Sequence, residues 1–115
     1  MSARILFVSD DIFFWARVRD VAISCGREAV RIGDEAAMEA AFRDGGVARV
    51  IMDLGARSVD VLRWAAAWGS ASPRPDLVAF GSHVDEAALE AARAAGFDTV
   101  MANSRLHRTL PELMR

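Results

Sequence analysis

Three carboxylates follow two apolar segments of the chain, and they are the residues best suited to chemistry. The run 5–8 is followed by Asp10 and Asp11, and the run 47–52 ends in Asp53. Carboxylate oxygens suit a small divalent cation such as Mg²⁺, which often accompanies phosphoryl groups. Yet the fourteen basic residues of the chain are all arginine. A lysine ammonium would offset the charge of a phosphoryl group beside these acids, so the acids favour a phosphoryl site and the absence of lysine argues against it.

The composition is that of one globular domain without a nucleic-acid partner. At 115 residues, 53% of them apolar, the chain has room for one core, so 1–115 is expected to be a single domain without an output domain. The net charge of −2 and the even spread of arginines give no basic stripe for nucleic acid. No apolar run is long enough to span a membrane, and no signal peptide is recognised, so a cytoplasmic protein is expected. Cys25 is expected to be a buried, inert thiol.

Short apolar runs alternate with segments of helical period, and this alternation predicts the secondary structure. The expected strands are 5–8, 28–32, 47–53, 77–80 and 99–102. Helices are expected from Ile12 and after the capping residues Asp34, Ser58 and Asp85, and the glycines that end them are Gly26, Gly45, Gly69 and Gly96. The tail after 102 is expected to be a short helix, interrupted or restarted at Pro111.

Five β–α units in a row with short connections predict an α/β fold. The predicted architecture is a doubly wound, flavodoxin-like parallel sheet with helices on both faces, in three layers. Open sheets of this kind bind ligands beyond the carboxyl ends of the strands, where the strand order reverses. In the order 2-1-3-4-5 the first and third strands flank that point, and Asp10, Asp11 and Asp53 follow them. The alternative role for Asp10 and Asp11 is to cap the next helix, and we expect both roles to coexist.

The chain resembles the receiver domain of bacterial response regulators, the phosphoryl-accepting module of two-component signalling. The resemblance covers nearly the whole length, from Ile5 to about Leu110, and its motifs are Val8-Ser9-Asp10-Asp11, Met52-Asp53-Leu54-Gly55 and the stretch 90–98. It implies a phosphoacceptor at Asp53 and Mg²⁺ held by Asp10, Asp11, Asp53 and the backbone carbonyl of Gly55. It also implies a Thr or Ser hydroxyl and a Lys that contact the phosphoryl oxygens.

The sequence departs from the receiver pattern at most of the supporting positions. Gly81 falls at the hydroxyl position, and Ser82 comes one residue late as a possible displaced hydroxyl. Asn103 falls at the lysine position, where a neutral amide cannot compensate a phosphoryl dianion. Ser9 takes the first acidic position. These departures predict a degenerate switch, an atypical receiver. His83 is expected to be a loop side chain beside the pocket.

Three functional hypotheses follow. The leading one is a stand-alone atypical receiver that is not an enzyme, beyond phosphoryl acceptance and self-dephosphorylation at Asp53, and that binds a partner signalling protein. The second keeps the switch: a histidine kinase phosphorylates Asp53, and Ser82 supplies the hydroxyl. The third is a small flavodoxin-like ligand-binding domain. The outward residues Ala87, Ala91 and Ala94 of the fourth helix are the candidate face for a partner or for a dimer.

Overall fold

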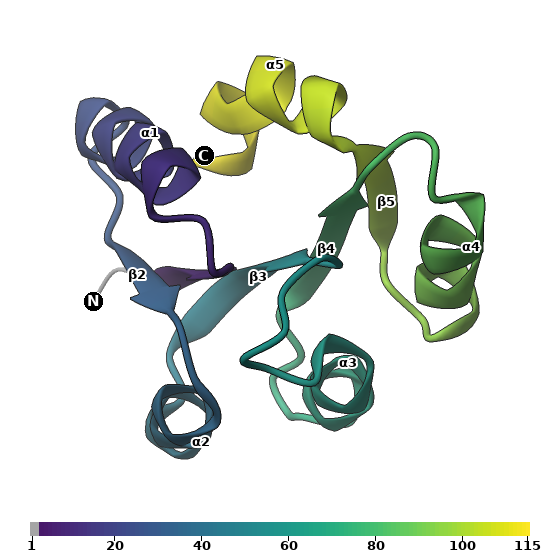
Figure 1. Cartoon of the computed structure of the whole chain (residues 1–115). Helices are drawn as coiled ribbons and strands as arrows, with labels where there is room; N and C mark the ends of the chain where they lie inside the picture. Colours follow the sequence, from purple (N-terminus) through teal and green to yellow (C-terminus); the bar gives the residue numbers. More distant parts are fainter. Residues whose placement is uncertain (1–2) are drawn as a thin grey trace.

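Five strands form the parallel sheet that the alternating pattern predicts. The structure is a computed structural model that describes residues 3–115, and it is drawn in Figure 1. The strands are β1 (Arg4–Val8), β2 (Ala29–Ile32), β3 (Val47–Asp53), β4 (Asp76–Gly81) and β5 (Thr99–Ala102). They pair in parallel in the order β2-β1-β3-β4-β5. The predicted strand order is confirmed.

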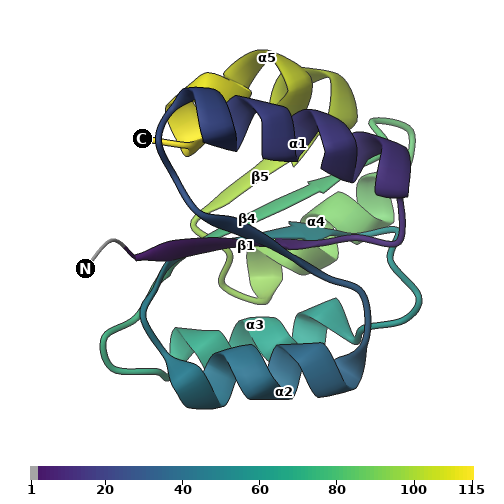
Figure 2. The ribbon, with the colours of Figure 1, turned by 90° about the vertical axis from the view of Figure 1, so that its left-hand side faces the viewer.

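Helices cover both faces of the sheet, as expected for a doubly wound fold. They are α1 (Ile12–Ser24), α2 (Glu35–Asp44), α3 (Val61–Gly69), α4 (Glu86–Ala94) and α5 (Asn103–Leu113). Helices α1 and α5 lie over one face, and α2 and α3 lie over the other (Figures 1 and 2). Helix α4 packs with α2 and α3 through Ala92, which belongs to their core cluster. Within residues 3–115 no helix is long and apolar enough to cross a membrane.

The central strands are buried on both faces, which explains their unbroken apolar runs. In β1, Leu6 and Val8 face α2 and α3, whereas Ile5 and Phe7 face α1 and α5, and all four side chains are fully buried. Strand β3 alternates in the same way. This burial fixes the register of β1 against β3 and therefore the position of their carboxyl ends.

Most helix starts match the sequence, but one predicted cap is wrong. Asp34 and Asp85 accept hydrogen bonds from backbone N–H groups in the first turns of α2 and α4, as predicted. Helix α3 is capped by Asp60, which accepts from the Arg63 N–H at 3.2 Å, and not by Ser58. Both side chains can cap a helix, so the sequence alone did not decide between them. The Ser58 hydroxyl bonds to Asp10 instead.

Two further expectations about local structure are corrected. Helix α5 runs from Asn103 to Leu113 without interruption, with Pro111 inside it. The fully buried side chains of Leu106, Leu110 and Met114 anchor that helix to the sheet and outweigh the hydrogen bond that the proline cannot donate. Cys25 is exposed and not buried. It lies in the turn after α1 ends, where the helical period no longer points it inward.

Glu35 at the start of α2 ties that helix to α3. Its carboxylate accepts hydrogen bonds from the Trp64 indole N–H at 2.9 Å and from the Asp60 backbone N–H at 3.0 Å, and it pairs with Arg63. The Trp64 indole, followed by the Asp60 N–H, lowers the pKa of Glu35 below its usual value of 4.5. Since Trp64 is only 6% exposed, its N–H has little access to water as an alternative partner.

Glu35→Ala is expected to lower the free energy of unfolding by about 1–3 kcal/mol, because the buried indole N–H of Trp64 loses its acceptor. Glu39→Ala, an exposed change on the same helix, should cost less than about 0.5 kcal/mol. Because folding lowers the pKa of Glu35, its contribution is complete above the unfolded value near 4.5. The contribution is lost as the pH falls through the lower, folded value. Urea unfolding between pH 7 and pH 3 measures this; equal losses for both variants at pH 7 would contradict it.

Candidate functional site

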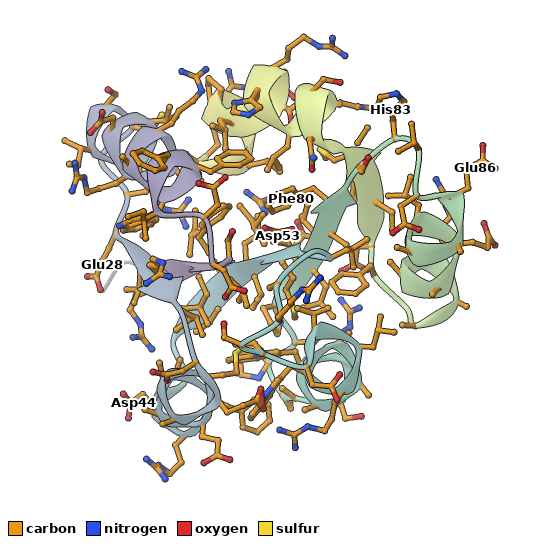
Figure 3. The ribbon with its side chains drawn as sticks, in the orientation of Figure 1. Glu28, Asp44, Asp53, Phe80, His83 and Glu86 are labelled. Carbon is orange, nitrogen blue, oxygen red and sulfur yellow. The ribbon has the colours of Figure 1, made fainter. Side chains whose placement is uncertain are left out.

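The carboxyl ends of β1 and β3 bring Ser9 and Asp53 together. Val8 is the register partner of Met52, so the next residue of each chain segment lies at the same edge of the sheet. The Ser9 hydroxyl donates to Oδ2 of Asp53 at 2.7 Å, and the Gly55 backbone N–H donates to Oδ1 at 2.8 Å. Both carboxylate oxygens of Asp53 therefore hold a hydrogen bond from the chain itself. Figure 3 shows Asp53 near the middle of the sheet, beside Phe80.

Ser9 is the centre of this hydrogen-bonded group. Its side chain is 1% exposed, and it is the one buried polar residue within 3–115. While its hydroxyl donates to Asp53, its oxygen accepts the Asp11 backbone N–H at 3.1 Å. A buried polar side chain is stable where its hydrogen-bonding groups are satisfied, and here the hydroxyl both donates and accepts. Ser9 therefore contributes to the site through its own hydrogen bonds, with Asp53 and with the Asp11 N–H.

Asp10 reaches across to the β3–α3 loop (residues 54–60). Its Oδ2 accepts the Arg57 backbone N–H at 2.8 Å, and its Oδ1 accepts the Ser58 hydroxyl. These two donors, with the Arg57 N–H contributing most, hold the pKa of Asp10 below its usual value of 3.8. Asp10 consequently joins the β1–α1 loop to the β3–α3 loop, a role that sequence reasoning did not foresee.

Asp11 has the capping role and not a place beside Asp53. Its Oδ1 accepts the backbone N–H groups of Phe13 and Phe14, each at 3.0 Å, at the start of α1. The expectation that Asp10 and Asp11 both cap the helix is therefore right for Asp11 alone. The three carboxylates serve three different purposes, although they come from the same edge of the sheet.

The donors at this edge do not fit a divalent cation as they are placed. Among residues 3–115, no three His, Cys, Asp or Glu side chains lie together as a metal-binding group. Mg²⁺ binds oxygen lone pairs in near-octahedral geometry, usually those of one or two carboxylates and several waters. Here the oxygens of Asp53 and Asp10 already face N–H or O–H donors, and Ser9 points a hydroxyl hydrogen into the site. The Gly55 group that contacts Asp53 is its N–H and not its carbonyl.

The supporting positions of a phosphoryl switch do not reach Asp53. Ser82 is exposed, and its hydroxyl oxygen accepts the nearby Val84 N–H at 3.4 Å. Asn103 is the exposed first residue of α5, and no side-chain hydrogen bond within residues 3–115 joins it to the site. His83, expected beside the pocket, lines a different hollow with Glu86 and Glu90 at the outer edge of α4 (Figure 3). Its predicted place is wrong, because the β4–α4 turn carries it away from β3.

Arg31 is a charged residue near the site that sequence reasoning missed. It lies on β2, and its guanidinium is one cause, the smallest, of the low pKa of Asp10. The group packs over Gly33, where a Cβ would lie 2.8 Å from Nη1 of the arginine. Its Nε is buried without a hydrogen-bond partner in the described part of the chain. An arginine inside a strand, followed two residues later by glycine, was the available signal.

Comparisons with solved structures place this geometry in a known fold. A response-regulator receiver domain from Bermanella marisrubri superposes with a TM-score of 0.82 at 20% identity, covering 99% of this chain and 96% of that one. A CheY-like receiver domain from Methanospirillum hungatei gives 0.79 at 14% identity, with 99% and 94% covered. The chain has the receiver fold. No protein-family model and no curated protein matches the sequence.

One receiver of this fold is described with its phosphoryl chemistry in place. It is a response regulator from Burkholderia pseudomallei with a phosphorylated aspartic acid, a calcium ion and citrate; it superposes with a TM-score of 0.77 at 14% identity, covering 97% of this chain and 71% of that one. At such identities the receiver fold is common to both chains, whereas the residues of the site are to be judged one by one. In this chain Asp53, at the end of β3, is hydrogen-bonded to Ser9.

Proposed function

We propose that this receiver-fold domain is a signalling module that acts by binding a partner protein, with Asp53 no longer serving as a metal-dependent phosphorylation switch. The observation that carries the proposal is the Ser9–Asp53 hydrogen bond of 2.7 Å. It occupies the oxygen that a metal or an incoming phosphoryl group would need. The receiver fold supports a role in signal transduction, and the altered site supports a role that does not depend on phosphoryl transfer.

Each position that would sense a phosphoryl group argues for the same conclusion. Gly81 has no hydroxyl, and Asn103 has no charge. Catalysis of phosphoryl transfer consists almost entirely of positioning and charge neutralisation, so a site without these groups loses most of the transition-state stabilisation. Asp10, which would hold the metal, instead holds the β3–α3 loop. These hydrogen bonds join the loop to the residue that follows Ser9 after β1.

Incubation with Mg²⁺ and acetyl phosphate, followed by intact-mass measurement, is expected to leave the wild-type protein unmodified. The physical reason is that Asn103 brings no charge to the lysine position, and that Ser9 donates its hydroxyl hydrogen to the Asp53 oxygen that a metal would bind. A phosphorylatable receiver domain treated in parallel serves as the positive control. A stoichiometric gain of one phosphoryl group, absent from Asp53→Asn, would show that the proposal is wrong.

The second candidate is a receiver phosphorylated on Asp53 by a histidine kinase, and one observation supports it. Asp53 is only partly buried and ends β3 at the edge where receivers accept phosphoryl groups. Under this alternative the Ser9 hydroxyl would turn away from Asp53 when metal binds. The acetyl phosphate experiment separates the two candidates, because only the second predicts modification that requires Mg²⁺.

A further inference from the structure

An apolar groove lies between α3 and α4, next to the loop that Asp10 holds. Its volume is about 260 Å³. The residues that line it come from the β3–α3 loop, the start of α3 and one side of α4, and they are Leu54, Ala56, Val59, Asp60, Val61, Leu62, Ala88 and Ala91. All but one are apolar. Leu62, near the start of α3, is 41% exposed.

The groove between α3 and α4 has apolar walls on both sides. Ala88 and Ala91 lie one turn apart on α4 and present no side chain beyond Cβ, so little side-chain bulk covers the groove along that helix. Leu62 and Val61 form the opposite wall at the start of α3. Figure 1 shows α3 below the sheet and α4 at its edge, with the β3–α3 loop entering from the centre. An amphipathic helix with a narrow apolar stripe matches a groove of this shape.

Asp60 gives the groove its charge. It is the only ionisable residue in the lining, and it is exposed. One carboxylate oxygen caps α3 through the Arg63 N–H, but Asp60 has no ion-pair partner in the described part of the chain, because the Arg63 guanidinium pairs with Glu35. An unpaired carboxylate at the edge of an apolar groove is complementary to a Lys or Arg on the occupant.

The groove is also connected to the switch-point site. Arg57 and Ser58, which Asp10 holds, lie between the lining residues Ala56 and Val59 of the same loop. The loop therefore cannot move away from Asp10 without moving one wall of the groove. The hydrogen bonds of Asp10 thereby position one wall of the groove.

We propose that the α3–α4 groove binds an amphipathic helix of a partner protein that carries a basic side chain opposite Asp60, and that Asp10 preorganises the groove through the β3–α3 loop. This inference rests on the proposed function, since it names the chemistry of the partner that the signalling module would bind. A preorganised loop lowers the entropic cost of binding, so the partner needs no prior phosphorylation of the domain.

The probe is a displayed library of amphipathic helical peptides whose polar positions are randomised over Lys, Glu and Gln, selected against the unphosphorylated protein. Lys-containing peptides are expected to be enriched. Their affinity should fall about tenfold or more for Ala91→Trp, which fills the groove. It should fall about threefold for Asp60→Asn, which keeps a capping side chain but removes the charge. Ala36→Trp, an exposed change on α2, is the matched control and should leave affinity unchanged.

Asp10→Ala tests the connection between the two sites. It should weaken binding of the selected peptide without altering its salt dependence, whereas Asp60→Asn should reduce the salt dependence. Hydrogen exchange at the Arg57 amide should rise in Asp10→Ala, because that N–H loses its acceptor. Unchanged peptide affinity in Asp10→Ala together with faster exchange at Arg57 would refute the preorganising role.

Several outcomes would overturn the proposal of a basic helix. They are enrichment of Glu-containing or neutral peptides, equal binding by wild type and Ala91→Trp, and failure of the library to yield any peptide. Self-association that Ala91→Trp abolishes, measured by sedimentation, would make a second copy of this chain the occupant and would also contradict it. None of these results depends on phosphorylation of Asp53, so the groove and the proposed function can fail separately.

Discussion

Ser9→Asp is expected to lower the free energy of unfolding by about 3 kcal/mol in metal-free buffer. The new carboxylate would replace a hydroxyl that is 1% exposed and would face Asp53, with which Ser9 shares a 2.7 Å hydrogen bond. Two carboxylates at that distance cannot both be ionised without a counter-ion. The Asp11 N–H would also have to find a new geometry. Urea unfolding in the presence of a chelator measures the loss.

Millimolar Mg²⁺ is expected to restore much of the stability of Ser9→Asp and to leave wild type unchanged. A cation present at a hundred times its dissociation constant stabilises the folded state by about 2.7 kcal/mol. The double variant Ser9→Asp/Asp53→Asn should be more stable than Ser9→Asp without metal and should respond less to Mg²⁺, because one of the facing charges is gone. A Ser9→Asp variant as stable as wild type in chelator would contradict the role assigned to Ser9.

The fold could be predicted from the sequence because its signals are long and redundant. The buried runs at 5–8 and 47–53 have no polar interruption, and a chain that alternates such runs with helices has few arrangements open to it. The predictions were wrong where the start or the continuity of a helix depended on a single residue. Serine and aspartate are both common capping residues; in the structure Ser58 bonds to Asp10, and Asp60 caps α3. Pro111 was expected to interrupt the last helix, because proline lacks an N–H donor. The buried side chains of that helix stabilise it, and it continues through Pro111.

The site was less predictable, because hydrogen bonds between distant residues decide it. The sequence placed Asp10 and Asp53 correctly at the ends of β1 and β3, since strand ends can be predicted. It could not tell that Asp10 would bind the Arg57 N–H, which is 47 residues away. Ser9 stood out only as a missing acid, although the structure makes it the donor to Asp53. Which groups a carboxylate bonds depends on loop conformation, and single residues carry little information about that.

If the switch was lost only through its side chains, restoring them should restore phosphoryl acceptance. The variant Ser9→Asp/Gly81→Thr/Asn103→Lys returns an acid for metal, a hydroxyl and an ammonium group to the positions that the receiver pattern uses. A Cβ at Gly81 would lie 3.4 Å from Leu54 and 3.7 Å from Leu89, which are ordinary contacts, so the backbone there has space for the first side-chain atom of the threonine. With Mg²⁺ and acetyl phosphate the triple variant is expected to gain one phosphoryl group per molecule by intact mass, and wild type none.

The single changes separate charge neutralisation from metal binding. Asn103→Lys alone should remain unmodified, because Ser9 still occupies the Asp53 oxygen and no metal bridges the phosphoryl group. Ser9→Asp alone should bind Mg²⁺ but accept phosphoryl groups slowly, since the transition-state charge lacks its lysine. The triple variant with Asp53→Asn is the control for the site of modification. A triple variant that binds Mg²⁺ and still stays unmodified would contradict the expectation that these three side chains suffice, and would direct attention to the β3–α3 loop, which Asp10 holds through Arg57 and Ser58.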